Sequence, residues 1–127
     1  MIVVDTSALM AIVLREPKYE ACIKALEAEI EVLISAGTLA EALVVSTRRR
    51  VVSPMARLLD KFDFEIEPVT SSYAQRIGQV YERWGKGLHP AGLNFGDCFA
   101  YALAKERSCP LLFVGEDFAK TDVVSAL

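Results

Sequence analysis

Histidine is almost missing from this chain: its 127 residues include one, His89. A single histidine cannot serve as both general acid and general base, which excludes catalysis by a histidine pair. Cysteine is also scarce, and Cys22, Cys98 and Cys109 form an odd number without a Cys-x-x-Cys spacing. This pattern indicates a reduced, cytoplasmic protein in which the three side chains are small buried hydrophobic groups.

Long hydrophobic runs are absent, since no apolar stretch approaches the roughly 20 residues that a membrane span needs. The first residues, Met1–Asp5, contain no basic segment and reach a charge at once, so we expect no signal peptide and no membrane partner. No repeat, low-complexity stretch or linker divides the chain. Its 127 residues, 53% of them hydrophobic, suffice for one core and not for two, which predicts a single domain over 1–127.

An excess of positive charge is absent as well, because the formal net charge is −3. This counts mildly against a protein that holds nucleic acid through its phosphates alone, and is neutral towards an acidic pocket that binds metal ions. Basic residues still cluster in two places: Arg48, Arg49, Arg50, Arg57 and Lys61 in one, and Arg83, Lys86 and His89 in the other. Each cluster fits a rim that contacts phosphate or, as the commoner alternative, a solvated face.

The sequence does contain a regular alternation of strand and helix patterns. Strands are predicted at 2–4, 31–35, 64–68 and 111–114, with a short last strand near 123–124, and helices at 8–14, 18–28, 38–49, 53–61, 70–84 and 94–107. This alternation predicts an α/β fold of three layers, α/β/α, around a central parallel sheet of four to five strands.

Local signals refine these elements. Thr6 and Ser7 are the expected cap of the first helix, and Gly85 is the expected stop of the fifth. Helical spacing places Leu43 and Tyr81 on buried faces. The strand at 64–68 alternates apolar and acidic residues, so we expect it near an edge of the sheet.

Four acidic residues lie where a predicted strand ends or a predicted helix begins: Asp5, Glu41, Asp97 and Asp117. The carboxyl ends of parallel strands share one edge of the sheet, where such folds bind ligands. Carboxylates that converge there repel one another unless a cation is bound, and hard oxygen ligands suit Mg²⁺ or Mn²⁺. A metal held in this way suggests chemistry on a phosphodiester.

The segments that carry these acids resemble the PIN-domain ribonucleases, and closely the VapC-type toxins of type II toxin–antitoxin pairs. The matching segments are Val3–Leu9 (VVDTSAL), Thr38–Ala42 (TLAEA), Asn94–Ala104 (NFGDCFAYALA) and Leu111–Asp122 (LLFVGEDFAKTD). The resemblance implies a PIN-like α/β domain that cleaves RNA with Mg²⁺ or Mn²⁺. It also implies a homodimer, and a VapB-like antitoxin that binds near the helices of residues 18–61.

Carried over residue by residue, the resemblance makes Asp5, Glu41, Asp97 and Asp117 the acidic quartet of the family. It gives Thr6 and Ser7 a role in orienting the carboxylates, and it makes Asp122 a further acidic position of varying importance. Glu116 stands where the family often has a polar residue, and whether it joins the site is left open.

The expected reaction is hydrolysis of an RNA phosphodiester, with a 5′ phosphate and a 3′ hydroxyl as products. Asp5, Asp97 and Asp117 would hold one or two cations, and Glu41 would orient the water or accept its proton. Three of the acids have a structural alternative as well. Glu41 could form a capping box with Thr38, Asp97 could favour its helix dipole, and Asp117 could be a turn residue.

Other classes of function fit less well. A phosphoacceptor domain would have a second acid beside Asp5, and an Asp-x-Asp phosphatase would have one in place of Ser7. A PIN fold that no longer cuts RNA and acts as a binding subunit stays open. The sequence also leaves open which RNA is cut and whether one metal ion or two are bound.

Overall fold

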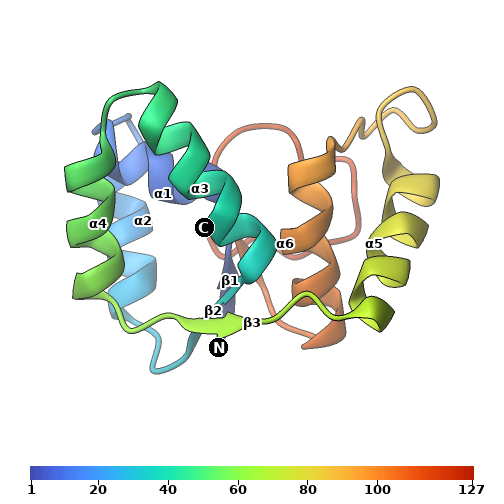
Figure 1. Cartoon of the computed structure of the whole chain (residues 1–127), viewed down its shortest axis with the longest axis horizontal. Coiled ribbons are helices and arrows are strands. Elements are labelled where there is room, and N and C mark those ends of the chain that lie inside the picture. Colours follow the sequence, from blue (N-terminus) through green and yellow to red (C-terminus); the bar gives the residue numbers. More distant parts are fainter.

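Helices and strands alternate along the computed structural model, which describes residues 1–127 (Figure 1). In chain order they are β1 (Ile2–Val4), α1 (Thr6–Val13), α2 (Tyr19–Glu27), β2 (Val32–Ser35), α3 (Ala36–Arg48), α4 (Val52–Lys61), β3 (Glu65–Glu67), α5 (Ser71–Trp84), α6 (Phe95–Glu106) and β4 (Leu111–Leu112). This order confirms the α/β alternation predicted from the sequence.

The four strands form one parallel sheet in the order β3-β2-β1-β4. Val3 in β1 lies opposite Leu33 of β2 on one side and Leu111 of β4 on the other. The predicted fifth strand near 123–124 is reduced to a single parallel bridge between Leu111 and Ser125. Because every strand runs the same way, the segments that carry Asp5 and Asp117 leave the sheet at the same edge.

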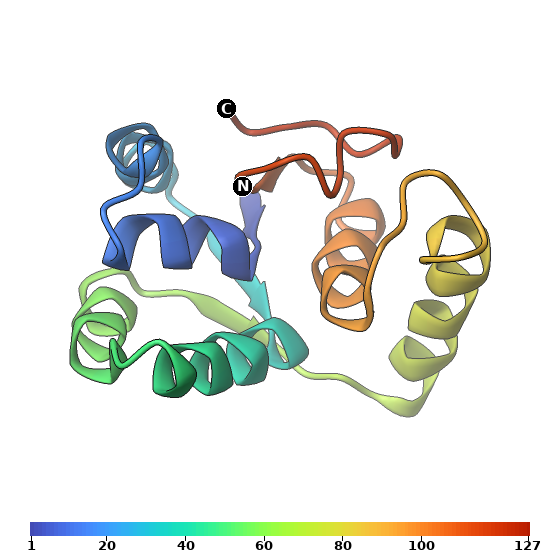
Figure 2. The same ribbon diagram turned by 90° about the horizontal axis from the view of Figure 1, so that it is seen from above.

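Helices cover both faces of this sheet (Figure 2). Alternate strand residues point to opposite faces, so Ile2 and Val4 pack in a core with α1, α2 and α4, whereas Val3 and Leu33 pack in a second core with α5 and α6. On the second face α6 lies against the sheet and α5 lies outside α6. The predicted three-layer architecture is therefore confirmed.

Strand β3 lies at the edge of the sheet, as its alternating pattern predicted. Its Glu65 and Ile66 side chains are exposed, and Glu67 is tied to Arg107 by an ion pair of 3.1 Å. Acidic side chains on an open edge discourage pairing with another strand.

Two helix starts differ from the sequence prediction. Helix α1 begins at Thr6, and its cap is Asp5, not Thr6 or Ser7, because the Asp5 carboxylate accepts from the Ser7 amide. Helix α3 begins at Ala36 with Ser35 as its cap. Thr38 therefore lies inside the helix, and the alternative of a capping box between Thr38 and Glu41 is wrong. In both cases a residue at the end of a strand caps the next helix: Asp5 directly follows β1, and Ser35 is the last residue of β2.

Gly85 ends α5, as the sequence predicted, with φ −70° and thus outside the left-handed region. Glycine is required there because a Cβ would overlap the Tyr81 carbonyl oxygen. Leu43 and Tyr81 are 48% and 38% exposed, so they are not in the buried stripes to which helical spacing assigned them.

Candidate active site

Asp5 is the most enclosed acid of the predicted quartet, with an exposed fraction of 3%. It sits between β1 and α1, where its Oδ2 accepts from the Ser7 backbone amide at 3.0 Å and from the Ser7 hydroxyl at 2.6 Å. Its other oxygen, Oδ1, is buried and has no hydrogen-bond partner in the protein. A buried carboxylate oxygen without a partner is costly, which indicates that something outside the chain completes it.

Ser7 also joins two strands at the edge of the sheet. Its Oγ accepts from the Val114 backbone amide at 3.1 Å while it donates to Asp5. Val114 lies in the segment that leads from β4 to Asp117. One hydroxyl therefore fixes the end of β1 relative to the end of β4, which agrees with the orienting role that the resemblance gave to Ser7.

Asp97 lies in the first turn of α6 and is 6% exposed. It forms a capping box with Asn94: the Asp97 amide donates to Asn94 Oδ1 at 2.9 Å, and the Asn94 amide donates to Asp97 Oδ2 at 3.0 Å. Asp97 therefore does stabilise the start of its helix, as the structural alternative proposed, but this role uses only one of its two carboxylate oxygens. Asp97 Oδ1 accepts no hydrogen bond from the protein and is available to a ligand.

Glu41 reaches the site from α3 and is half-buried. The Thr6 hydroxyl donates to Glu41 Oε1 at 2.6 Å, so Thr6 orients this carboxylate, as the resemblance implied. The carboxylate lies against Gly96, directly before Asp97, where an added Cβ would overlap it. In return, the Phe99 ring of α6 fills the space where a Cβ on Gly37 of α3 would lie.

This exchange of contacts between α3 and α6 is the feature that sequence reasoning missed. Each helix presents a glycine to a large side chain of the other, which brings Glu41 beside the turn that holds Asp97. One feature of the sequence could have indicated this contact: Gly96 directly precedes the candidate acid Asp97. Glycine destabilises a helix, so its presence there suggests a close contact with another element.

Asp117 lies in the exposed loop after β4, two residues beyond Gly115, whose φ of +100° makes a turn that favours glycine. Its charge is among the causes that raise the pKa of Asp97. The loop therefore brings Asp117 within electrostatic reach of the buried acids, although no hydrogen bond holds its side chain.

The four acids act on one another electrostatically. Burial, with a smaller contribution from the charge of Glu41, raises the pKa of Asp5 to about 6 against the lowering effect of the bonds from Ser7. Burial also raises the pKa of Asp97 to about 7, with the charges of Asp5, Asp117 and Glu41 adding to the effect. Asp97 is therefore coupled to each of the other three acids, and Asp5 is coupled to Glu41.

No basic side chain offsets this cluster, because none of the four ion pairs in the structure involves a member of the quartet. In this conformation, however, no three His, Cys, Asp or Glu side chains lie close enough together to hold a metal ion. Binding of a shared cation therefore requires side-chain adjustment, and Asp117 is the member that the protein holds least.

Asp122 belongs to a different network. Its carboxylate accepts from the Tyr101 hydroxyl and pairs with Lys105 at 3.3 Å, and the Tyr101 hydroxyl accepts from Trp84 Nε1 at 2.9 Å. These contacts tie the last segment to α6 and α5. Glu116 is exposed and has no ion pair. The predicted supporting role of Asp122 stays a prediction, with its side chain already engaged elsewhere.

Two findings concern the predicted setting of the protein. Cys22, Cys98 and Cys109 are free thiols, so no disulfide forms, and the first two are fully buried. None of the helices combines the length and the apolar character needed to cross a membrane.

Comparison with known proteins agrees with this geometry. The family model of the PIN domain matches residues 2–124. The chain is 41% identical to ribonuclease VapC30 of Mycobacterium tuberculosis over 97% of this chain and 96% of that protein. Among solved structures, M. tuberculosis VapC20, described as a sarcin–ricin loop cleaving toxin, superposes with a TM-score of 0.78 at 18% identity, covering 98% of this chain and 97% of that one. A toxin–antitoxin complex from Klebsiella pneumoniae contains a chain with a TM-score of 0.71 at 22% identity, covering 100% of this chain and 98% of that one.

A parallel sheet with carboxylates gathered at one edge and this family match define a PIN domain. Within that family the chain belongs to the VapC ribonucleases, the toxins of toxin–antitoxin systems. The expectations of fold, family and ribonuclease activity that the sequence raised are thereby confirmed.

Proposed function

We propose that this VapC ribonuclease is a metal-dependent endoribonuclease that hydrolyses RNA phosphodiester bonds at the cluster of Asp5, Glu41, Asp97 and Asp117. The observation that carries the proposal is the buried Asp5 Oδ1, which has no protein partner and lies in a cluster that no basic side chain offsets. A divalent cation would satisfy this oxygen and remove the repulsion among the acids.

The residues present fit such a cation in their chemistry. Carboxylate oxygens are the ligands that Mg²⁺ and Mn²⁺ prefer, and Asp5 and Asp97 each keep one oxygen free of protein hydrogen bonds. We propose Asp5, Asp97 and Asp117 as the residues that hold one or two ions. The bound metal would supply a water of lowered pKa and would stabilise the charge that develops on the phosphodiester.

The remaining residues prepare the cluster. Ser7 holds Asp5 Oδ2, so that Oδ1 has a fixed direction, and Thr6 holds Glu41 Oε1. Glu41 is less buried than Asp5 and Asp97, and its Oε2 accepts no hydrogen bond from the protein. That oxygen is suited to orient the attacking water or to accept its proton.

We also propose the partners that the resemblance implied: an RNA substrate, a second copy of the chain in a homodimer and a VapB-like antitoxin. The antitoxin would bind near the helices of residues 18–61. Ala28, Val44 and Val52 are exposed on these helices, as expected for a groove that takes an amphipathic helix, whereas Val51 is half-buried. The Klebsiella complex supports the presence of an antitoxin. A single domain over 1–127 and a cytoplasmic location complete the proposal.

Cleavage of a mixed RNA pool by the purified protein tests the proposed function. We expect cleavage with Mg²⁺ or Mn²⁺, none with EDTA, and none with Asp5→Asn. A matched control is Asp63→Asn, because Asp63 is exposed and outside the cluster, and this variant should cleave normally. Mapping the cut ends should give a 5′ phosphate and a 3′ hydroxyl.

A non-cutting binding subunit would give the opposite result. Wild type and Asp5→Asn would then be equally inactive in every metal, and neither would gain thermal stability from Mg²⁺. Activity that persists in EDTA would exclude the metal mechanism and leave the ribonuclease activity standing.

A further inference from the structure

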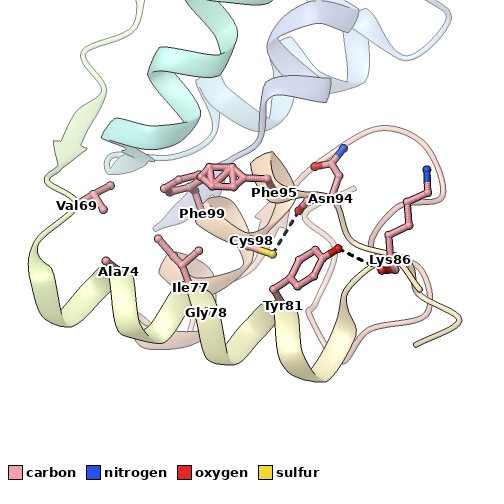
Figure 3. Close-up of a pocket in the computed structure, with 10 residues that line it drawn as sticks. All are labelled: Val69, Ala74, Ile77, Gly78, Tyr81, Lys86, Asn94, Phe95, Cys98 and Phe99. Carbon is pink, nitrogen blue, oxygen red and sulfur yellow. Dashed lines mark hydrogen bonds between the residues drawn. The ribbon is translucent and has the colours of Figure 1, made fainter. Parts of the chain in front are cut away.

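A large apolar hollow opens between α5 and α6 (Figure 3). Its volume is about 740 Å³, and seven of its ten lining residues are hydrophobic. A second hollow of about 540 Å³ shares Asn94, Phe95 and Phe99 with the first and is also lined by Glu41 and Gly96. The two hollows therefore meet at a pair of aromatic rings, and the second one reaches the proposed catalytic cluster.

Phe95 is the exposed member of this aromatic pair. It is the first residue of α6, two positions before Asp97, and its exposed fraction is 66%. Its ring stands edge to face against Phe99, with centroids 4.9 Å apart and an interplanar angle of 81°. A large apolar ring left in water beside a catalytic cluster, with its orientation supported by a neighbour, is typical of a binding surface.

Polar groups border the apolar floor. The Asn94 amide is held in one orientation, because its Oδ1 accepts from the Asp97 backbone, and its Nδ2 donates to no protein group. Lys86 lines the same hollow and forms no ion pair, and its carbonyl oxygen accepts from the Tyr81 hydroxyl at 3.2 Å. The hollow therefore combines aromatic faces with a free amide donor and a free cation (Figure 3).

This combination fits a nucleobase with its attached phosphate. A base has an apolar face that stacks on aromatic side chains and a polar edge that accepts hydrogen bonds, and its phosphate attracts lysine. An apolar protein helix would not need the free amide and the unpaired lysine beside the rings. Continuity with the acidic cluster favours the RNA substrate as the occupant.

We propose that Phe95 stacks a nucleobase of the RNA, next to the phosphodiester that is cut, and that Asn94 and Lys86 contact the edge of that base and its backbone. The inference rests on the proposed function, whose cleavage site it extends. Because a base inside a duplex cannot reach such a ring, the substrate must present this nucleotide unpaired. Phe95 is then a positioning residue that helps to select where the strand is cut.

Binding in a background that cannot cut separates this proposal from the proposed function. In Asp5→Asn protein, fluorescence anisotropy of a short labelled single-stranded RNA pool measures affinity, whether or not wild type cleaves. We expect Phe95→Ala and Phe95→Leu to weaken binding about ten-fold or more, and Phe95→Tyr to bind as well as Phe95, because only an aromatic ring stacks. Ile30→Ala, which removes a fully exposed apolar side chain outside the hollow, should change nothing.

Three outcomes would overturn the proposal. Full affinity in Phe95→Leu would show that the ring only fills space. Normal RNA binding by Phe95→Ala, together with loss of a dimer in light scattering, would make a second copy of the chain the occupant. The third outcome is that the parent Asp5→Asn protein binds no RNA from the pool. In active protein, the proposal also requires that Phe95→Ala raise KM or move the cut position without changing the stabilisation by Mg²⁺.

Discussion

At the scale of the residue, the two oxygens of the Asp5 carboxylate have opposite effects on the stability of the fold. Its Oδ2 caps α1 and accepts two hydrogen bonds from Ser7, which stabilises the first turn of the helix. Its Oδ1 is buried without a partner, and its charge is opposed by the neighbouring Glu41. The cap therefore stabilises the folded protein, whereas the buried charge destabilises it. A substitution that keeps the cap and removes the charge distinguishes the two effects.

Asp5→Asn should make the metal-free protein more stable while it abolishes cleavage. Asparagine is also a good helix cap, so the bond to the Ser7 amide is kept and the buried charge is removed. At pH 8 in EDTA we expect the free energy of unfolding to rise by on the order of 1–2 kcal/mol, or a few degrees in Tm. Thermal unfolding measures this, and a lower Tm than wild type would show that the charge is satisfied within the protein.

Asp122→Asn should leave cleavage unchanged, because the carboxylate is engaged with Tyr101 and Lys105 and not with the acidic cluster. Exposed ion pairs contribute about 0–1 kcal/mol, so the expected loss of stability is small. The comparison of cleavage rates between this variant and wild type tests the role of Asp122. A loss of activity comparable to that of Asp5→Asn would place Asp122 in the catalytic site after all.

At the scale of the element, the sequence predicted which segments are strands and helices better than where they begin. The alternation along the chain and the edge position of β3 follow from local patterns and are confirmed. The predicted starts of α1 and α3 were wrong because Asp5, directly after β1, and Ser35, the last residue of β2, are the caps of these helices.

The contact between α3 and α6 could not be predicted from local patterns. It depends on Gly37 packing against Phe99 and on Gly96 packing against Glu41, residues that are far apart in the chain. The periodicity of a single helix carries no information about contacts between two helices. The four candidate acids could be named from the sequence, whereas the way in which Glu41 approaches Asp97 required the structure.

Gly96→Ala should therefore act on catalysis through packing. The added methyl group overlaps the Glu41 carboxylate, so either the two helices separate or Glu41 loses its bond to Thr6. We expect a loss of about 1–3 kcal/mol in stability and at least a ten-fold lower cleavage rate. Urea unfolding and a cleavage assay measure the two effects.

Gly78→Ala provides the matched control for this substitution. Gly78 is inside α5, and nothing lies within 4 Å of a Cβ added there. Alanine in the middle of a helix is favoured over glycine by about 0.5–1 kcal/mol, so this variant should be slightly more stable and equally active. A Gly96→Ala variant as stable and as active as Gly78→Ala would mean that α6 has room at Gly96 and that the proposed contact with Glu41 is not critical.

At the scale of the whole molecule, the acidic cluster links stability to pH and metal. The pKa values of Asp5 and Asp97 are raised from 3.8 to about 6 and about 7, so the folded protein binds more protons than the unfolded chain over this range. Metal-free protein should then lose stability as pH rises from about 4 to about 7, and level off above. The lowered pKa of Asp122 has the opposite sign and acts only in more acidic solution.

Thermal unfolding in EDTA at pH 5, 6, 7 and 8 tests this expectation. Tm should fall by several degrees across the series, and Mg²⁺ should restore more of it at pH 8 than at pH 5, because protons and metal compete for the same oxygens. A Tm that rises with pH in EDTA would contradict the assignment of two raised pKa values. The Asp5→Asn variant should show a shallower fall than wild type.

The order of the strands has a consequence for the time at which this toxin becomes active during its synthesis. The four acids come from chain positions 5, 41, 97 and 117, and β4 must pair with β1 before the loop of Asp117 reaches the others. A chain still growing on the ribosome can form β1, β2 and most helices, yet it holds an incomplete cluster until residue 117 has emerged. The cluster is therefore completed only after residue 117 has left the ribosome, whereas the helices of residues 18–61, the proposed antitoxin surface, emerge earlier.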